Sequence, residues 1–233
     1  MHAVILLSGG LDSATALAVA QSQGLICHAL TIDYGQRHRP ELHASQLVAS
    51  QLNAASHKLI AVDLRSIGGS ALTSNLAVPK DRSAKAIAGG VPITYVPARN
   101  LIFMSIASGY AETLNATTLV VGVNAVDYSG YPDCRQEFVD AFIQCVNLGT
   151  KAGTQDGRPF SVFAPLVQLS KPDIIRLGTK LGVDYALTTS CYDPSLDAIG
   201  PLACGHCDSC QIRREGFAAA GVVDPTRYLE QTR

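Results

Sequence analysis

The sequence contains no tryptophan, and only 6% of its 233 residues are aromatic. Charged residues make up 16% of the chain and the formal net charge is −1, which argues against a broad nucleic-acid-binding surface. No apolar run has the length of a membrane span. No basic segment precedes the first predicted strand, so we expect no signal peptide, no membrane partner and a cytoplasmic location. Hydrophobic residues account for 47%, enough for the core of one large α/β domain.

Two common glycine-rich nucleotide-binding patterns are also missing. No loop ends as the Walker sequence does, in Gly-Lys-Ser or Gly-Lys-Thr, and Gly-x-Gly-x-x-Gly is absent. The chain instead carries SGGLDS at residues 8–13, between an apolar run and an apolar helical pattern. A strand, a glycine-serine turn and a helix start would place backbone N–H groups and the positive end of a helix dipole around an anion. Asp12 would repel a phosphate, so we predict that it holds Mg²⁺ or caps the helix.

Predicted strands and helices alternate along most of the chain. Strands are predicted at 3–7, 26–32, 58–62 and 118–123, and helices at 13–23, 40–52, 101–114, 136–148 and 174–181. Repeated βα units predict a Rossmann-like parallel sheet with helices on both faces and ligands at the carboxyl ends of the strands. Residues 66–96 are rich in glycine and proline and predict a long excursion, and a short extended piece is expected within 158–167.

The seven cysteines are odd in number, which argues for a reducing compartment and a metal site rather than a disulfide framework. Cys204, Cys207 and Cys210 are spaced by three, and Cys191 lies thirteen positions before the first of them. Four thiolates suit tetrahedral Zn²⁺ in a closed structural site, although an iron–sulfur cluster uses the same ligands. His206 is an alternative fourth ligand to Cys191. The isolated Cys27 and Cys145 are predicted to be packing residues.

Polar stretches after predicted strands are candidates for ligand contacts. In DYGQRHR at residues 33–39, the arginines could meet phosphates and His38 could bind phosphate or move protons, unless this is a solvated loop. Arg99 precedes a helix whose dipole it opposes, which favours an anionic ligand over a structural carboxylate partner. In residues 122–135, Asp127 and Asp133 could hold a base-like substrate, and Arg135 could meet a carboxylate. Lys171 could stabilise phosphate charge.

Together these segments resemble one family, the 7-cyano-7-deazaguanine synthases of the queuosine-precursor pathway, which belong to the PP-loop ATP-pyrophosphatases. The matching segments are SGGLDS at 8–13, DYGQRHR at 33–39, VPARN at 96–100, GVNAVDYSGYPDCR at 122–135 and the four cysteines. The first alone indicates only the wider ATP-pyrophosphatase class, whereas the SGYPDCR stretch with four cysteines is more specific. The resemblance runs nearly from end to end.

The resemblance implies an adenine-nucleotide α-hydrolase-like fold, a Rossmann-like domain at 1–187 and a C-terminal zinc-binding helical segment at 188–233 packed on it. It implies a homodimer that converts 7-carboxy-7-deazaguanine and ammonia to 7-cyano-7-deazaguanine. ATP would adenylate first the acid and then the amide intermediate. Such chemistry requires orientation and charge stabilisation but no covalent nucleophile, so Cys134 is not interpreted as one.

The resemblance also assigns residue roles. Asp12, Arg99 and Lys171 would be catalytic, with Asp12 placing Mg²⁺. The residues implied to bind ATP are Leu7, Ser8, Gly9, Gly10, Leu11, Asp12, Ser13, Ala14, Thr15, Ala16 and Leu17. The residues implied to bind the deazaguanine are Tyr34, Gln36, His38, Asn100, Asp127, Tyr131, Pro132, Asp133 and Arg135. One Zn²⁺ per chain would be held by Cys191, Cys204, Cys207 and Cys210.

Other functions compatible with parts of the sequence stay open. Another PP-loop ATP-pyrophosphatase, such as a tRNA thiolase or an amidotransferase-like ligase, would share SGGLDS, but the net charge of −1 disfavours a tRNA surface. A diverged relative could act on another deazapurine. A zinc-ribbon binding module without enzymatic activity would not need SGGLDS. The expected partners are therefore small molecules, with no direct nucleic-acid partner.

Overall fold

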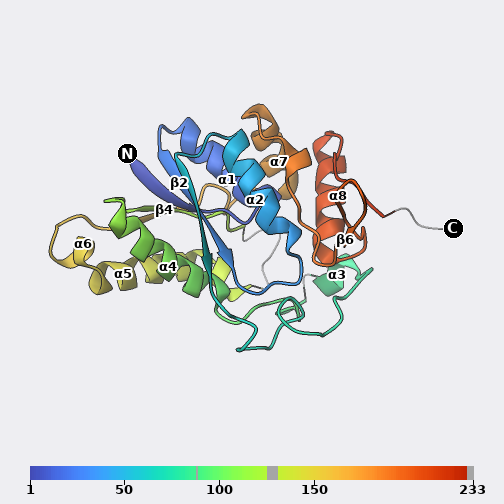
Figure 1. Cartoon of the computed structure of the whole chain (residues 1–233), viewed down its shortest axis with the longest axis horizontal. Helices are drawn as coiled ribbons and strands as arrows, with labels where there is room; N and C mark the ends of the chain where they lie inside the picture. Colours follow the sequence, from blue (N-terminus) through green and yellow to red (C-terminus); the bar gives the residue numbers. More distant parts are fainter. Residues whose placement is uncertain (88, 125–130, 230–233) are drawn as a thin grey trace.

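Figure 1 shows the computed structural model, which describes residues 1–87, 89–124 and 131–229. Its centre is a sheet of five parallel strands in the order β3-β2-β1-β4-β5. The strands are β1 (His2–Leu6), β2 (Ile26–Asp33), β3 (Ser56–Ala61), β4 (Thr118–Val120) and β5 (Ser161–Phe163). The chain runs outward from β1 in both directions, so the predicted Rossmann-like parallel sheet is confirmed.

Helices cover both faces of the sheet (Figure 1). One face carries α1 (Leu11–Ser22), α2 (Pro40–Gln51) and α7 (Lys171–Lys180), with α8 (Asp208–Ala220) packed on α7. The other face carries α4 (Arg99–Thr113) and α5 (Gln136–Gly149). Along β1, Ala3 and Ile5 belong to the first core and Val4 to the second, because successive side chains of a strand point to opposite faces. This explains why β1 is apolar without alternation.

The predicted regular elements are present with small shifts at their ends. In its described residues, the excursion at 66–96 contains one short helix, α3 (Ala84–Ile87), as its glycines and prolines suggest. Strand β4 ends at Val120 rather than at residue 123, because its partner β5 ends at Phe163, to which Val121 N still donates at 3.0 Å. The sequence did not predict the short elements α6 (Lys151–Thr154), η1 (Pro132–Cys134), η2 (Tyr185–Leu187), β6 (Ser195–Leu196) and β7 (Pro201–Leu202). Elements this short show no periodicity.

Successive strands are added first on one side of β1 and then, from β4 on, on its other side. The loops after β1 and β4 therefore diverge, and a crevice forms between them. A close backbone contact fixes this crevice. A Cβ added to Gly122, just after β4, would come within 3.0 Å of the Ser13 nitrogen and Cα. Glycine at 122 therefore lets the end of β4 lie directly against the start of α1.

No helix in the described residues is both long and apolar enough to cross a membrane.

Helices α1 and α7 meet around a buried hydroxyl pair, which generates a stability prediction. Thr15 Oγ1 lies 2.8 Å from Tyr185 Oη, and a Cβ at Gly178 would overlap that tyrosine oxygen. We expect Gly178→Ala to lower the free energy of unfolding by about 1–3 kcal/mol through overpacking. Urea unfolding measures this change.

Gly109→Ala is the matched control, because Gly109 lies inside α4 and a Cβ there has no neighbour within 4 Å among the described residues. The added methyl group should raise stability by up to about 1 kcal/mol, since alanine is the better helix former. Equal stabilities for the two variants would contradict the packing argument.

Candidate active site and metal centre

The SGGLDS loop forms a cradle without a side-chain cap. Gly10 is the N-cap residue of α1, and no side chain among the described residues accepts the first N–H groups of the helix. The hydroxyl oxygens of Ser8 and Ser13 lie 3.0 Å apart, and Ser13 Oγ donates to Gly10 O at 3.1 Å. The loop is thus closed by its own hydroxyls, while the helix N-terminus remains available to an anion.

Glycine at position 9 lets α2 pack directly on this loop. Gly9 has a φ of +83°, and a Cβ there would overlap the Glu41 carbonyl and lie 2.6 Å from the Ser45 nitrogen. On the other side, Thr189 N donates to Gly9 O at 3.0 Å. The loop is therefore held by α2, by the end of β4 and by the segment after η2.

A cavity of about 250 Å³ opens from the loop at the carboxyl edge of the sheet. It brings together predicted residues from five separate parts of the chain. Those that line it are Leu7, Ser8, Gly10, Leu11, Asp12, Ser13, Tyr34, His38, Arg99, Asn100, Tyr131 and Lys171. This clustering is what a shared ATP and substrate site requires.

Asp12 and Lys171 form an ion pair at the floor of this cavity. Lys171 Nζ lies 2.7 Å from Asp12 Oδ1 and 2.8 Å from Oδ2, and the lysine side chain is only 7% exposed. Gly216 of α8 leaves room for the Lys171 side chain, because a Cβ at this position would come within 2.5 Å of Lys171 Cγ. The two groups predicted to hold Mg²⁺ and phosphate are thus each other's partners in this structure.

Arg99 and aromatic residues also line the cavity. Ala98 adopts the left-handed conformation with a φ of 54°, and Arg99 then begins α4. The guanidinium carbon of Arg99 lies 6.0 Å from the centroid of the Tyr34 ring. Its ionisable neighbours among the described residues are three tyrosines and Cys134, which are neutral at ordinary pH, rather than carboxylates, and this leaves the Arg99 charge for an anionic ligand.

Several residues that the resemblance assigns to ligands do not line the cavity of the described chain. Ala14, Ala16 and Leu17 are core residues of α1, and Thr15 bonds to Tyr185. Gly9 acts through its backbone contacts. The remaining residues of this kind are Gln36, Pro132, Asp133 and Arg135. Asp127 lies outside the described residues.

Two of these residues support others instead. Asp133 Oδ2 accepts a hydrogen bond from Asn100 N at 3.0 Å, and Asp133 O accepts one from Asn100 Nδ2 at 3.0 Å, so Asp133 fixes the first turn of α4. Gln36, 2% exposed, joins the Tyr34 backbone to Glu41. In the same loop, Arg37 donates to Leu76 O and Arg39 pairs with Asp33, so neither arginine lines the cavity.

The cavity also contains residues that the sequence did not indicate, among them Glu41, Phe103, Asn124, Thr189, Tyr192 and Arg213. Arg213 comes from α8 and donates to Thr188 Oγ1 at 2.8 Å and to Tyr185 O at 3.1 Å. It thereby secures the segment that holds Gly9. Thr189, Tyr192 and Arg213 carried no signal because α8 and the segment before it reach the site only through tertiary packing.

Cys134 lies beside the cavity but is not activated. Burial raises the pKa of its thiol to about 12, and its Sγ accepts a hydrogen bond from Asn100 Nδ2 at 3.3 Å. A nucleophilic cysteine needs a lowered pKa. The environment of Cys134 therefore supports a packing role.

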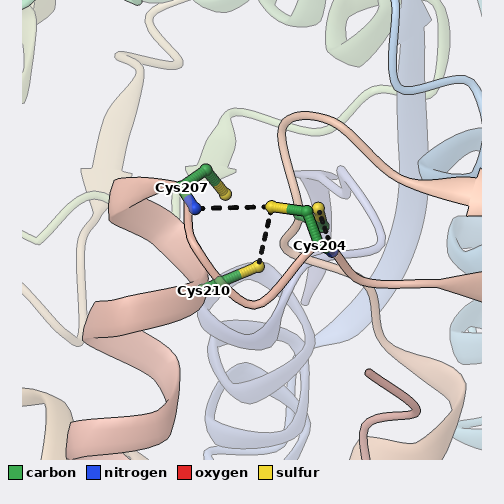
Figure 2. A group of neighbouring side chains, drawn as sticks. Cys204, Cys207 and Cys210 are labelled. Carbon is green, nitrogen blue, oxygen red and sulfur yellow. Dashed lines mark hydrogen bonds between the residues drawn. The ribbon is translucent and has the colours of Figure 1, made fainter. Parts of the chain in front are cut away.

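The four clustered cysteines form a buried group that could hold a metal ion. The sulfur atoms of Cys191, Cys204, Cys207 and Cys210 lie within 4.8 Å of one another, and all four residues are buried. Figure 2 shows three of them converging from the turn before α8 and from its first turn. Backbone N–H groups of residues 193, 204, 206 and 207 donate to the sulfurs of Cys191 or Cys204. This pattern stabilises thiolates that hold a metal ion.

The other candidates for this metal site are accounted for. The His206 ring lies 2.7 Å from Asp81 Oδ1, so Cys191 rather than His206 completes the cluster. Cys27 is buried in β2 as predicted. The packing role predicted for Cys145 is wrong, because that side chain is exposed.

The excursion at 66–96 docks on this metal site. Lys80 Nζ lies 2.9 Å from Asp193 Oδ2, and Arg82 Nη1 lies 2.8 Å from Asp208 Oδ2. Between these ion pairs, Asp81 N donates to His206 O at 2.8 Å. The cysteine cluster therefore anchors both α8 and the excursion.

Comparison with known proteins gives a consistent result. The family model described as queuosine biosynthesis protein QueC matches residues 2–221. The 7-cyano-7-deazaguanine synthase of Pseudomonas syringae pv. syringae (strain B728a) is 58% identical over 98% of this chain and 96% of its own. The synthase of the same name from Methylococcus capsulatus is 57% identical over 97% of this chain and 98% of its own. Among solved structures, NMN synthetase from Francisella tularensis aligns at a TM-score of 0.48 and 23% identity, covering 95% of this chain and 77% of its own.

Removing one cysteine of the cluster tests its role. We expect Cys207→Ser to lose bound metal and to lower the free energy of unfolding by at least about 2 kcal/mol, because metal binding contributes to folding. Metal analysis and thermal unfolding measure the two effects. Cys145→Ser, at the exposed cysteine, should change neither. Full metal content in the Cys207 variant would refute ligation by this residue.

Proposed function

This chain belongs to the queuosine biosynthesis protein QueC family of 7-cyano-7-deazaguanine synthases, which are ATP-dependent ligases, and we propose that it converts 7-carboxy-7-deazaguanine and ammonia to 7-cyano-7-deazaguanine. One observation carries the proposal. The uncapped helix N-terminus at SGGLDS opens into the same cavity as the aromatic and cationic residues Tyr34, Arg99 and Tyr131. A nucleotide phosphate and a flat heterocycle can therefore meet there.

The reaction begins when the substrate carboxylate attacks the α-phosphate of ATP. Pyrophosphate leaves and an acyl-adenylate forms. Because a carboxylate is a poor acyl donor, this step supplies the leaving group that ammonia later displaces as AMP. A second adenylation, at the amide oxygen, allows elimination to the nitrile. In each round the protein must orient the two partners and stabilise charge on the phosphates.

The residues of the cavity suit these tasks. The N–H groups of the SGGLDS loop bind the phosphates, and Lys171 and Arg99 stabilise their charge. Asp12 is one of two carboxylates lining the described cavity, and a carboxylate together with phosphate oxygens is the usual environment of Mg²⁺. When ATP enters, Lys171 exchanges Asp12 for phosphate, and Asp12 becomes available to the cation.

The deazaguanine lies between aromatic side chains in this proposal. Tyr34 and Tyr131 supply flat surfaces, and Asn100, fixed by Asp133, offers an amide to the heterocycle. Asp127, which lies outside the described residues, and Pro132 and Arg135, which do not line the described cavity, stay predicted substrate contacts.

We further assign one Zn²⁺ per chain to the cysteine cluster, because four buried thiols with N–H donors suit a closed tetrahedral site. In this proposal, residues 188–233 are a zinc-binding segment that packs on the domain of residues 1–187 and stabilises it. The enzyme acts as a homodimer in the cytoplasm, where free thiols persist. Metal analysis separates zinc from an iron–sulfur cluster, and light scattering gives the oligomeric state.

The function is tested by incubation with ATP, MgCl₂, ammonium and 7-carboxy-7-deazaguanine. Mass spectrometry should detect the nitrile, and each nitrile should be accompanied by two molecules of AMP, since the acid and the amide are adenylated in turn. AMP without nitrile would restrict the activity to the wider ATP-pyrophosphatase class.

Asp12→Asn tests the role of the negative charge of Asp12. The substitution keeps the shape of the side chain but removes its negative charge, so we expect nitrile formation to fall by at least about 100-fold. Circular dichroism checks that the fold persists. Asp140→Asn, at an exposed carboxylate on α5, is the control and should retain full turnover. An Asp12→Asn enzyme with normal turnover would exclude the assigned role.

A further inference from the structure

The nitrile-forming reaction needs a proton acceptor, and the cavity contains a buried histidine with one unused nitrogen. We propose that His38 is the general base of the reaction, and that Glu41 and Gln36 position it. This inference rests on the proposed function, since it concerns proton transfer from the nitrogen that enters the product.

A chain of hydrogen bonds fixes the orientation of the His38 ring. Tyr34 N donates to Gln36 Oε1 at 2.9 Å, and Gln36 Nε2 donates to Glu41 Oε1 at 2.8 Å. The second carboxylate oxygen of Glu41, Oε2, lies 2.9 Å from His38 Nε2. An ionised carboxylate only accepts hydrogen bonds, so Nε2 carries the proton and Nδ1 of the neutral ring holds the lone pair.

Nδ1 is buried and has no hydrogen-bond partner among the described residues. The whole residue is only 5% exposed. A buried nitrogen without a partner costs free energy, and natural proteins keep few such groups. The bond from Nε2 to Glu41 therefore leaves Nδ1 as the proton acceptor. The same arrangement occurs in histidine bases whose other ring nitrogen donates to a carboxylate.

The position of this pair in the site matches the reacting atoms. His38 and Glu41 both line the cavity, and the backbone of Glu41 packs on Gly9 of the SGGLDS loop. The carbon that bears the adenylate must lie next to the α-phosphate, and thus close to this loop. No movement of α2 is needed to bring the base to that end of the cavity.

Other polar groups around the ring come from three further segments. Tyr34 Oη, after β2, lies 3.5 Å from His38 Nε2, and the Tyr192 ring centroid lies 6.0 Å from that of His38. Arg99 on α4 lies over Tyr34. Burial raises the pKa of Tyr34 above its ordinary value, so its phenol stays protonated and does not compete as a base.

Three proton transfers fit this base. When ammonia attacks the acyl-adenylate, a C–N bond forms, the C–O bond to AMP breaks, and His38 Nδ1 takes one proton from the attacking nitrogen. In the second round the adenylated amide carries two N–H protons, and Nδ1 takes them in turn: loss of the first gives the neutral imidate, and the last N–H proton is taken as the nitrile forms. That N–H pair becomes the third C–N bond, AMP leaves with the C–O pair, and the nitrile results. The imidazolium returns each proton to solvent, so atoms and charge balance without another reagent.

Adenylation itself requires no base, because the attacking carboxylate is already ionised. Loss of a base should therefore spare the adenylation step, whereas loss of a binding residue should impair it. We expect His38→Gln to retain exchange of labelled pyrophosphate into ATP, measured with the acid and without ammonium, within about threefold of the unmodified enzyme. Nitrile formation should fall about 100- to 10,000-fold, the usual effect of a lost general base. The loss should persist with 7-amido-7-deazaguanine as substrate, where only the second adenylation and the elimination remain.

Glu41→Gln tests the positioning role with little change of shape. A glutamine cannot accept from both Gln36 and His38, so the tautomer of His38 is no longer fixed, and we expect nitrile formation to fall at least about tenfold with pyrophosphate exchange retained. His43→Gln is the matched control, because it removes an exposed histidine from the same helix. It should leave both activities unchanged.

The outcomes are decisive in each direction. Nitrile formation by His38→Gln at the normal rate would overturn the proposal, as would the loss of pyrophosphate exchange in a variant that remains folded by circular dichroism. If His38→Gln does not fold, unchanged nitrile formation by Glu41→Gln would overturn it. Failure of the proposed function looks different, because the unmodified enzyme would then produce no nitrile.

Discussion

The close contact of the SGGLDS loop with three neighbouring segments determines the rest of the site. Gly9 packs on α2, Gly122 brings β4 against Ser13, and Thr189 bonds to the loop carbonyl. Each contact is between backbone atoms. A larger residue at Gly9 or Gly122 therefore could not be accommodated by a change of side-chain rotamer. The loop keeps an open helix N-terminus because its surroundings, rather than a cap, hold its conformation. The helix dipole and its N–H groups are thereby reserved for the ligand.

The cysteine cluster acts on this site from a distance. It anchors α8, which places Arg213 and gives Lys171 its path past Gly216, and it anchors the excursion whose Thr94 bonds to Tyr131. The segment that follows Cys191 brings Tyr192 against His38. The cysteine cluster thus connects four parts of the cavity, although none of its sulfur atoms is proposed to take part in the chemistry.

The sequence was informative where a local pattern carries the physics. The apolar strands, the glycine-serine turn and the spacing of Cys204, Cys207 and Cys210 each report on neighbours along the chain, and the parallel sheet, the loop and the cysteine cluster follow from them. Contacts between distant segments carry no such signal. Arg213 and Tyr192 reach the cavity only because α8 and the segment that follows Cys191 fold back on the sheet. For the same reason the sequence could not show that Gln36 and Asp133 bond to Glu41 and Asn100.

The ion pair between Lys171 and Asp12 has a consequence for the cycle of the enzyme. Without nucleotide, the buried ammonium group already has a counter-ion, so the site is electrically balanced before ATP arrives. In the proposed cycle, ATP binding exchanges one partner of Lys171 for another instead of neutralising an unpaired charge, which would limit how tightly the polyphosphate is held. When AMP and pyrophosphate depart, the same pair can form again. For an enzyme that must adenylate its substrate twice, an internal counter-ion favours release between the two rounds over accumulation of product.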